Sequence, residues 1–307
     1  MVRLVSRTLL ALIVAFVVGA VAVGQSVQLR YAYRQGERLR YDVTLKGNGT
    51  ISSPTLGQND PFEMSGTLAY VQDVQKVDQS GNATLHTVVQ DSTINATWGG
   101  QPIPVALALP PLTVQTTPTG KILSCTVASA STQQLPGLGL AGADMATQAF
   151  DFSKFFGSTQ NIGFPVAAVS PGSEWADTST VTTPDGARLV ITSSSKLLGF
   201  ADYQGVRCAK IYTTYKAPIS LEMVQLGIPF KLAGSEEGTM TAYFAPAEGR
   251  LIASLGKVVA DLTMSGQVAV GGERQQVVAV GMQSQTDVRV RLAGVGAQLR
   301  GTSTRSR

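Results

Sequence analysis

Residues 39–46 read Leu-Arg-Tyr-Asp-Val-Thr-Leu-Lys, a strict alternation of apolar and polar side chains. Successive side chains of a β-strand point to opposite faces, so the four apolar side chains share one face and the charged ones share the other. A strand with one buried and one hydrated face is typical of antiparallel sheets. This stretch therefore predicts an antiparallel sheet that covers a hydrophobic core on one side only.

The same period of two recurs along the chain, in residues 29–34, 258–264 and 287–292. Clusters of Gly, Pro, Asp and Asn separate the strand-like runs, at residues 78–82, 118–120, 184–186, 246–249 and 271–272. Tight turns join antiparallel neighbours, whereas parallel strands need long crossovers. We therefore predict a mainly β (α+β) fold, built as a large curved antiparallel sheet or half-barrel.

Three segments depart from the alternation. Residues 101–113 are apolar but rich in proline, which removes ladder donors and predicts a sheet edge or an extended loop. Residues 134–160 are rich in glycine and then helix-like, which predicts a short helical insert around 139–157. Residues 223–232 are apolar around a Gly-Ile-Pro sequence and predict a strand with a kink.

The N-terminus predicts export. Arg3 and Arg7 precede an apolar run from Leu9 to Val23, which is shorter than the roughly 20 residues of a spanning helix. This order is typical of a signal peptide, here residues 1–24, with cleavage before Gln25. The alternative is that this segment is not cleaved and stays as a membrane anchor. If it is cleaved, no other membrane contact of the chain is predicted. The expected location is extracytoplasmic, periplasmic or secreted, in a bacterium.

The remaining chain predicts a single β-rich domain over residues 25–293. Residues 134–162 divide this domain, and whether the parts on either side are two similar halves is an alternative that the sequence does not decide. Residues 294–307 are rich in Gly, Ser and Arg and predict a disordered basic tail.

The chain has two cysteines, Cys125 and Cys208, each in a strand-like run. In an oxidising compartment an even count permits one disulfide, which is the favoured interpretation. The alternative is two buried thiols.

Composition argues against several function classes. Charged residues make up 14% of the chain and the formal net charge is +4, without a basic stripe carrying interleaved aromatic residues. Nucleic acid is therefore not an expected partner. The sequence from Gly137 to Gly142 matches a Gly-x-Gly-x-x-Gly loop, but no βαβ pattern surrounds it, so no cofactor is predicted.

No catalytic constellation is recognisable in the sequence. Its one histidine, His86, lies in a strand-like run opposite Leu85, and one imidazole cannot supply a multi-histidine metal site. A hydrolase would need paired carboxylates, and the formal candidates are Glu174, Asp185 and Glu248. The adjacent Glu236 and Glu237 are interpreted as part of a solvated loop. We predict no catalytic residue, no metal and no enzymatic activity.

Several short motifs together carry a resemblance to a known group of proteins. They are Tyr-Ala-Tyr-Arg-Gln-Gly-Glu-Arg-Leu-Arg-Tyr at 31–41, Ser-Pro-Gly-Ser-Glu-Trp at 170–175, Gly-Val-Arg-Cys-Ala-Lys-Ile at 205–211, Gly-Thr-Met-Thr-Ala-Tyr-Phe at 238–244 and Gly-Arg-Leu at 249–251. This arrangement resembles uncharacterised bacterial exported proteins of the lipoprotein-carrier (LolA/LppX-like) superfold. In that superfold a curved antiparallel sheet wraps around helices and holds acyl chains.

The resemblance implies a non-catalytic envelope protein that binds or carries a hydrophobic or lipid ligand. The alternative is a structural or protein-interaction module of the envelope with no small-molecule ligand. If a ligand binds, the helical insert and the proline-rich segment would cover it, and its apolar lining would be Leu107, Leu109, Leu112, Phe152, Phe155, Phe156 and Phe230. Oligomeric state is not predicted.

Overall fold

The computed structural model describes residues 26–53, 57–103, 111–127, 162–182, 188–225, 228–270 and 273–297. The predicted signal peptide and the predicted helical insert at 139–157 lie outside these ranges. So do Leu107, Leu109, Phe152, Phe155 and Phe156 of the predicted ligand lining. Of the predicted tail, residues 294–297 are described, and they form the end of the last strand, which reaches Ala297.

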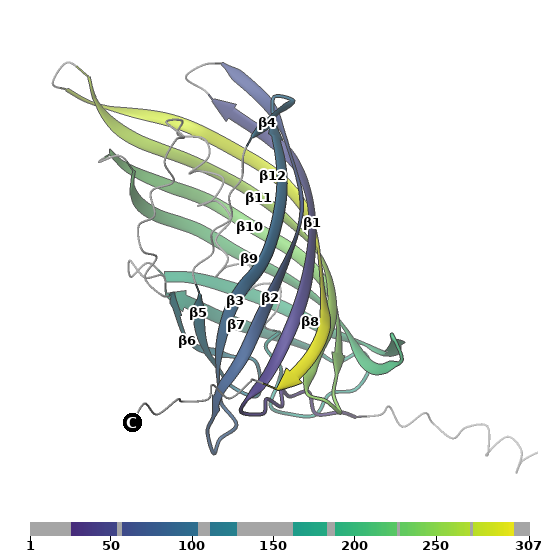
Figure 1. Ribbon diagram of the computed structural model, residues 1–307. Coiled ribbons are helices and arrows are strands. Elements are labelled where there is room, and N and C mark those ends of the chain that lie inside the picture. The colour runs from purple at the N-terminus through teal and green to yellow at the C-terminus, as the bar shows by residue number, and fades with distance from the viewer. Residues whose placement is uncertain are drawn as a thin grey trace, which may run out of the picture.

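The described residues form one antiparallel sheet of twelve strands (Figure 1). The strands are β1 (Glu37–Ser53), β2 (Gln58–Val77), β3 (Ala83–Trp98), β4 (Gln101–Ile103), β5 (Leu112–Thr116), β6 (Ile122–Val127), β7 (Glu174–Thr182), β8 (Arg188–Tyr203), β9 (Val206–Gln225), β10 (Ile228–Ala245), β11 (Arg250–Val270) and β12 (Glu273–Ala297).

Two meanders build this sheet and meet at the first and last strands. The spatial order is β6-β5-β3-β2-β1-β12-β11-β10-β9-β8-β7, with β4 paired to the end of β3. The edge strands β6 and β7 approach each other, with Cα atoms within 8 Å, so the sheet curls into a nearly closed, barrel-like wall. The predicted β-rich curved antiparallel sheet is confirmed.

Several turns lie where the sequence predicts them, at 78–82, 118–120 and 246–249. In the first of these the Asp78 carboxylate accepts hydrogen bonds from the backbone N–H groups of Ser80 (2.8 Å) and Asn82 (2.9 Å). Gly81 there has a φ of 81°, a conformation that suits glycine. Asp and Gly are thus used for the geometry of this turn.

The predicted kinked strand at 223–232 is wrong. β9 ends at Gln225, β10 begins at Ile228, and these two residues are antiparallel partners. The apolar run is therefore the tip of a hairpin, and its glycine belongs to the connection rather than to a kink. Phe230, from the predicted ligand lining, lies in β10 opposite Gly266 of β11.

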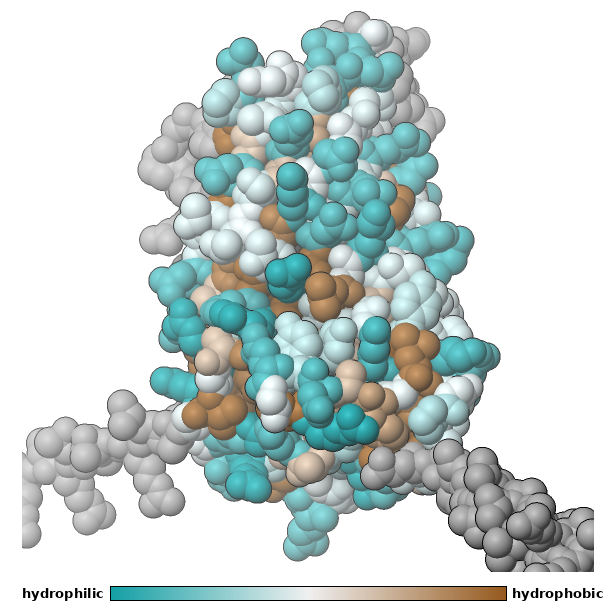
Figure 2. All heavy atoms as spheres, turned by 90° about the vertical axis from the view of Figure 1, so that its right-hand side faces the viewer, coloured by the Kyte–Doolittle hydropathy of each residue, from teal (hydrophilic) through white to brown (hydrophobic). Residues whose placement is uncertain are grey.

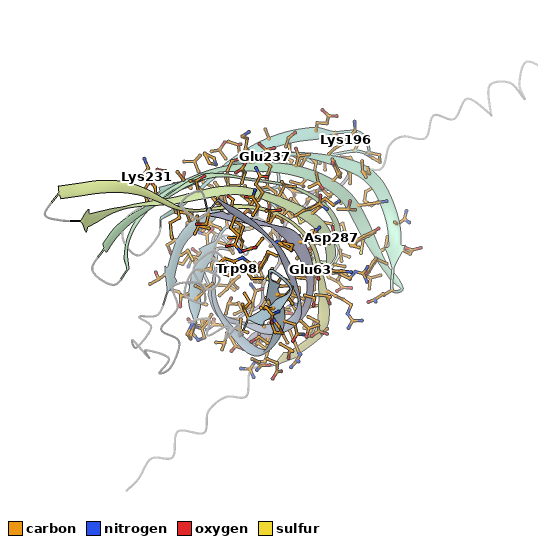
Figure 3. All side chains as sticks on the ribbon, turned by 90° about the horizontal axis from the view of Figure 1, so that it is seen from above. Glu63, Trp98, Lys196, Lys231, Glu237 and Asp287 are labelled. Atoms are coloured by element: carbon orange, nitrogen blue, oxygen red, sulfur yellow. The ribbon has the colours of Figure 1, made fainter. Side chains whose placement is uncertain are left out.

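The two faces of the wall differ in polarity. Charged side chains such as Glu63, Asp287, Glu237, Lys196 and Lys231 point away from the interior (Figure 3). The outer surface in Figure 2 is mostly hydrophilic, with scattered hydrophobic residues. The opposite face, which we call the inner face, carries the buried apolar side chains of the alternation, Leu39, Tyr41, Val43 and Leu45 among them. The alternation in residues 39–46 thus sets the polarity of the two faces.

One end of the wall is filled by two irregular segments, residues 26–36 and 162–170, which we call the plug. They are joined by an isolated antiparallel bridge between Val27 and Val169. The sequence predicts a sheet strand at 29–34, and this prediction is wrong, because these residues form an extended segment of the plug. Its apolar side, with Leu29 fully buried and Tyr31 5% exposed, lies on the core.

Candidate functional site

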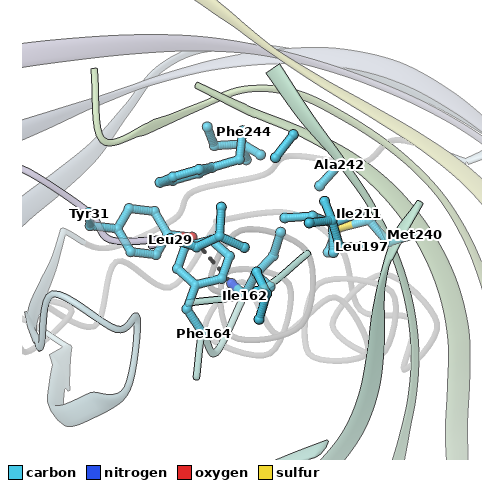
Figure 4. Packing of buried hydrophobic residues seen from close by; sticks show 12 residues of the cluster. Leu29, Tyr31, Ile162, Phe164, Leu197, Ile211, Met240, Ala242 and Phe244 are labelled. Atoms are coloured by element: carbon cyan, nitrogen blue, oxygen red, sulfur yellow. Dashed lines mark hydrogen bonds between the residues drawn. The ribbon is translucent and has the colours of Figure 1, made fainter. Parts of the chain in front are cut away.

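The plug packs on the inner face through aromatic and aliphatic contacts (Figure 4). Tyr31 stacks on Phe164 with ring centroids 5.2 Å apart, and both contact the ring of Phe244, which is fully buried in β10. The rest of this cluster comes from β8 to β11 and includes Leu197, Ile211, Met240 and Leu251. The inner face is therefore fully used as core at this end, which we call the plugged end.

Backbone hydrogen bonds hold the plug to the turns of the plugged end. The N–H of Tyr31 donates to Pro118 O at 2.7 Å, and the N–H of Phe164 donates to Thr119 O at 2.7 Å. The indole N–H of Trp175 in β7 donates to Gly163 O at 2.6 Å. These bonds satisfy plug groups that the sheet ladder does not reach, which makes the plug a fixed part of the fold.

A buried ion pair also lies at the plugged end. Arg250 Nη2 is 3.0 Å from Glu37 Oε1, and the two side chains are 11% and 10% exposed. Burial raises the pKa of Tyr41 well above its usual value, and the charge of Arg250 opposes this rise. The ion pair joins the first residue of β1 to the first residue of β11.

The strands continue well beyond the plug. In β10, Met240 contacts the plugged-end cluster and the strand extends to Ile228, about 40 Å of chain at 3.3 Å per residue. We call this part of the wall, on β1–β3 and β8–β12, the distal half. Its inner face is our candidate functional site, since of the described residues the plug covers only the other end.

Strand register identifies the side chains of the distal inner face. One ring of paired positions consists of Gly49, Ser284, Ala260, Glu236 and Ala217, and the next ring towards the plug includes Gly47, Thr286, Val258, Gly238 and Tyr215. All members of the first ring except Glu236 are small, and the second ring contains two glycines. Beyond them the inner face becomes apolar again, with Ile51, Met282, Leu262 and Ile219. The distal half thus has a belt of small side chains bordered by apolar ones.

Two glycines, one in the belt and one in the apolar ring beyond it, are required by close backbone approach. A Cβ on Gly49 would meet the carbonyl oxygen of Gln283 on β12, and a Cβ on Gly234, where φ is 149°, would meet that of Asp261 on β11. Glycine inside a strand lets the strand bend, which is how curled sheets are built. These glycines therefore allow the curvature of the wall.

The main polar pair of the distal inner face is Tyr215 with Glu236. The hydroxyl of Tyr215 donates to Glu236 Oε1 at 2.9 Å, from β9 to β10. Tyr215 is 5% exposed and its ring lies over Gly238. Glu236 and Glu237 are central strand residues, so their predicted placement in a solvated loop is wrong. Glu237 faces outward and pairs with Lys216.

The carboxylates considered for hydrolysis lie on separate elements. Glu174 in β7 faces outward and bonds to Lys196 at 2.7 Å, which lowers the pKa of Glu174 below its usual value. Glu248 lies in the β10–β11 turn, 3.6 Å from Arg250. Asp185 lies outside the described residues. Among the described side chains, no group of three or more His, Cys, Asp or Glu could hold a metal ion.

The predicted disulfide is wrong. Cys208 is fully buried in a cluster with Ala245 and Ile252 on the outer side of the wall. Cys125 in β6 packs instead against the cluster of Leu39 and Tyr41 on the inner side. No bond joins the two cysteines. Burial raises the pKa of the Cys208 thiol to about 11.

Two other predicted residues can be placed. Leu112, from the predicted ligand lining, is 3% exposed and belongs to the core between β3 and β6. His86 in β3 lies opposite Asp73, on the face away from buried Leu85, as predicted. Within the described ranges, no helix has the length and apolar character needed to cross a membrane.

The fold defines a class of architecture: a curled antiparallel wall, polar outside and apolar inside, with one end plugged. No family model matches the chain, and no curated protein matches its sequence. Solved structures give distant likenesses. Lipovitellin is 10% identical with a TM-score of 0.48, over 88% of this chain and 26% of that chain.

Two bacterial structures are also similar in part. An outer membrane channel from Pseudomonas putida F1 is 6% identical with a TM-score of 0.22, over 85% of this chain and 97% of that one. A DUF1329 family protein from Desulfovibrio piger is 10% identical with a TM-score of 0.16, over 84% and 86%. All these TM-scores lie below 0.5, so nothing about this chain's function follows from them. The resemblance to lipoprotein carriers stays a prediction.

Proposed function

We propose that this chain is an exported, non-catalytic bacterial protein that binds a hydrophobic or lipid ligand on the distal inner face. The observation that carries the proposal is the contrast along that face. Apolar and small side chains continue beyond the plug, on strands whose outer positions carry charge. Ala217, Ile219 and Leu262 belong to a buried apolar cluster in the distal half, which offers a hydrocarbon ligand apolar surroundings.

The dimensions fit an acyl chain. Half of a bilayer's hydrocarbon core is about 15 Å thick, which is the space that one layer of acyl chains fills. The roughly 40 Å of β10 beyond Met240 exceeds this length. Known ligand sites are mostly apolar with a few polar groups, and the distal inner face has this composition.

Export rests on the N-terminal sequence, with Arg3 and Arg7 before the apolar run from Leu9 to Val23. The absence of catalysis in the proposal rests on the sequence as well, which has a single histidine. The proposal has no reaction step and assigns no residue to one.

The experiment is native mass spectrometry of the protein purified from a bacterial envelope, followed by binding of N-phenylnaphthylamine, whose emission rises in apolar surroundings. We expect co-purified lipid or saturable dye binding. Leu232→Asn, on the inner side of β10, should weaken binding, and Lys231→Asn, its outward neighbour, should not. A bare mass together with no dye binding would contradict the proposal and favour a structural role in the envelope.

A further inference from the structure

The segment 26–36 of the plug lies across the end of the wall, at the level of its turns. The N–H of Tyr31 donates to Pro118 O at 2.7 Å in the β5–β6 turn. The N–H of Ala32 donates to Gly249 O at 2.9 Å in the β10–β11 turn. Both turns lie at the extremity of the plugged end (Figure 1). The side of the segment that is turned away from the core therefore faces out of the molecule.

The outward side of this segment is basic. Leu29 and Tyr31 lie on the core. The alternation places Arg30 and Arg34 on the opposite side, where both are exposed. The β5–β6 turn adds the exposed side chain of Lys121. The plug and this turn contain no acidic residue. Among the ion pairs between described residues, none includes any of these three cations.

The acids of the neighbouring turns have partners of their own. Asp78 accepts hydrogen bonds from the backbone N–H groups of its turn. Glu248 lies 3.6 Å from Arg250 in the β10–β11 turn. At the β8–β9 turn, Asp202 lies 3.7 Å from Arg207. The positive charge on the outward side of the plug is therefore not neutralised by an ion pair within the described residues.

An exposed apolar loop lies beside these cations. Residues 165–168 of the plug read Pro-Val-Ala-Ala. Val166 is 75% exposed, the largest exposed fraction among the large hydrophobic residues that the structure describes. The side-chain amide of Gln28 donates to Val166 O at 3.0 Å, and Gln28 lies two residues before Arg30 on the same outward side. This bond holds the apolar loop next to the basic side chains.

The chain adds further positive charge at this end. β12 ends at Ala297, which is the partner of Glu37 at the start of β1, so the sequence that follows leaves the wall at the plugged end. That sequence contains Arg300, Arg305 and Arg307 and no acidic residue. The plugged end thus combines an apolar loop, exposed cations and the start of a basic tail.

We propose that the plugged end docks on an anionic phospholipid membrane, with the loop 165–168 among the headgroups and Arg30, Arg34 and Lys121 at the phosphates. Peripheral binding to membranes combines buried apolar area with electrostatic attraction to anionic lipids, and this surface offers both. A membrane fits better than a nucleic acid, because it has hydrocarbon directly beneath its anionic layer. The inference requires export but does not depend on a ligand in the distal half.

The test is cosedimentation of the purified protein with two kinds of vesicle, one of phosphatidylcholine alone and one of equal parts of phosphatidylcholine and phosphatidylglycerol. We expect about tenfold stronger binding to the anionic vesicles at low salt, and a weaker preference as the salt concentration rises. Equal binding to the two kinds of vesicle, or no binding to either, would overturn the inference. Dye binding in solution tests the proposed function separately, so the two can fail independently.

Paired charge variants locate the docking surface. Arg30→Gln combined with Arg34→Gln should lower the affinity for anionic vesicles about tenfold, because both cations are lost from the plugged end. Lys231→Gln combined with Lys257→Gln removes the same charge from exposed outward positions of β10 and β11, and should leave the affinity unchanged. Urea midpoints establish that each variant is folded. Equal losses from the two folded double variants would contradict docking through the plugged end.

The apolar loop and the tail are tested in the same assay. Val166→Asn should lower the affinity about fivefold. Val259→Asn, at a position on β11 that is 47% exposed, should not lower it. Removal of residues 298–307 should weaken the preference for anionic vesicles without abolishing it. If that removal abolishes the preference while the Arg30 and Arg34 double variant keeps it, the tail and not the plug binds the membrane.

Discussion

The plugged end and the distal half are built on the same strands but use the inner face differently. At the plugged end, Phe244 and its neighbours meet the plug residues Tyr31 and Phe164, and each buried aromatic ring has a partner. In the distal half, the same face of β10 carries Gly238, Glu236 and Gly234. The comparison teaches that aromatic rings from the plug fill one end. In the other half the wall's own side chains, such as Ile219 and Leu262, form a buried cluster that has small and polar residues beside it.

The largest expected effect is at the plugged end. Phe244→Ala should lower the free energy of unfolding by about 3–5 kcal/mol, because it removes the ring that both plug aromatics contact. Urea denaturation followed by circular dichroism measures this. Val259→Ala, an exposed position on β11, should change it by less than about 0.5 kcal/mol. Equal effects of the two substitutions on the free energy of unfolding would contradict the interpretation that the plug contacts stabilise the fold.

The next largest effect tests how closely the plug packs against the turn at Gly120. Gly120 has a φ of 82°, and a Cβ there would meet the carbonyl oxygen of Ile162 in the plug. Gly120→Ala should cost about 2–3 kcal/mol, through backbone strain together with displacement of the plug. Gly100 has a similar φ of 78° with open space around it, so Gly100→Ala should cost about 1 kcal/mol. If the plug were not fixed in place, Gly120→Ala and Gly100→Ala would lower the free energy of unfolding by similar amounts.

Alkaline pH should weaken the plugged end first. Burial raises the pKa values of Tyr31 and Tyr41 above their usual value, and raises that of Cys208 to about 11. These groups keep their protons longer when folded, so their contribution to stability is complete below about pH 9 and is lost as the pH rises through 11. Urea midpoints at rising pH measure this loss, and Tyr41→Phe should make it shallower. A midpoint that stays constant to pH 11 would contradict it.

The smallest effect compares the two tryptophans of the chain as reporters. Trp98 lies at the distal rim, and Trp175 is bonded to the plug. A brominated fatty alcohol should quench the fluorescence of Trp98 in the Trp175→Phe variant, and should quench Trp175 much less in Trp98→Phe. The reverse order would place the ligand at the plugged end.

The sequence predicted the wall well because its signal is local. The alternation from Leu39 to Leu45 defines inner and outer positions directly, and the turns follow from Asp, Gly and Pro. The sequence did not distinguish the plug from a sheet strand, because the side chains of an extended segment packed on a core alternate between buried and exposed just as those of a strand do. Only its long-range bonds, such as that from Tyr31 to Pro118, distinguish it.

The candidate site was predicted less well. The seven lining residues were chosen for apolarity, and Leu112, the one whose side chain is described, is core. Glu236 was interpreted as a loop residue because it stands beside Glu237. Counting by twos from Met240 would have put Glu236 on the inner face, but the contact with Tyr215 depends on which strands pair.

The pairing of β1 with β12 has a consequence for biogenesis. Glu37 is matched with Ala297, so the seam between the two meanders joins residues at opposite ends of the chain. A nascent chain can form each meander by itself, but it cannot join them until its final strand has been delivered. Until then β1 and β11 have unsatisfied edges that invite aggregation. A nonsense mutation before β12 would therefore leave a chain whose two meanders are not joined into one sheet.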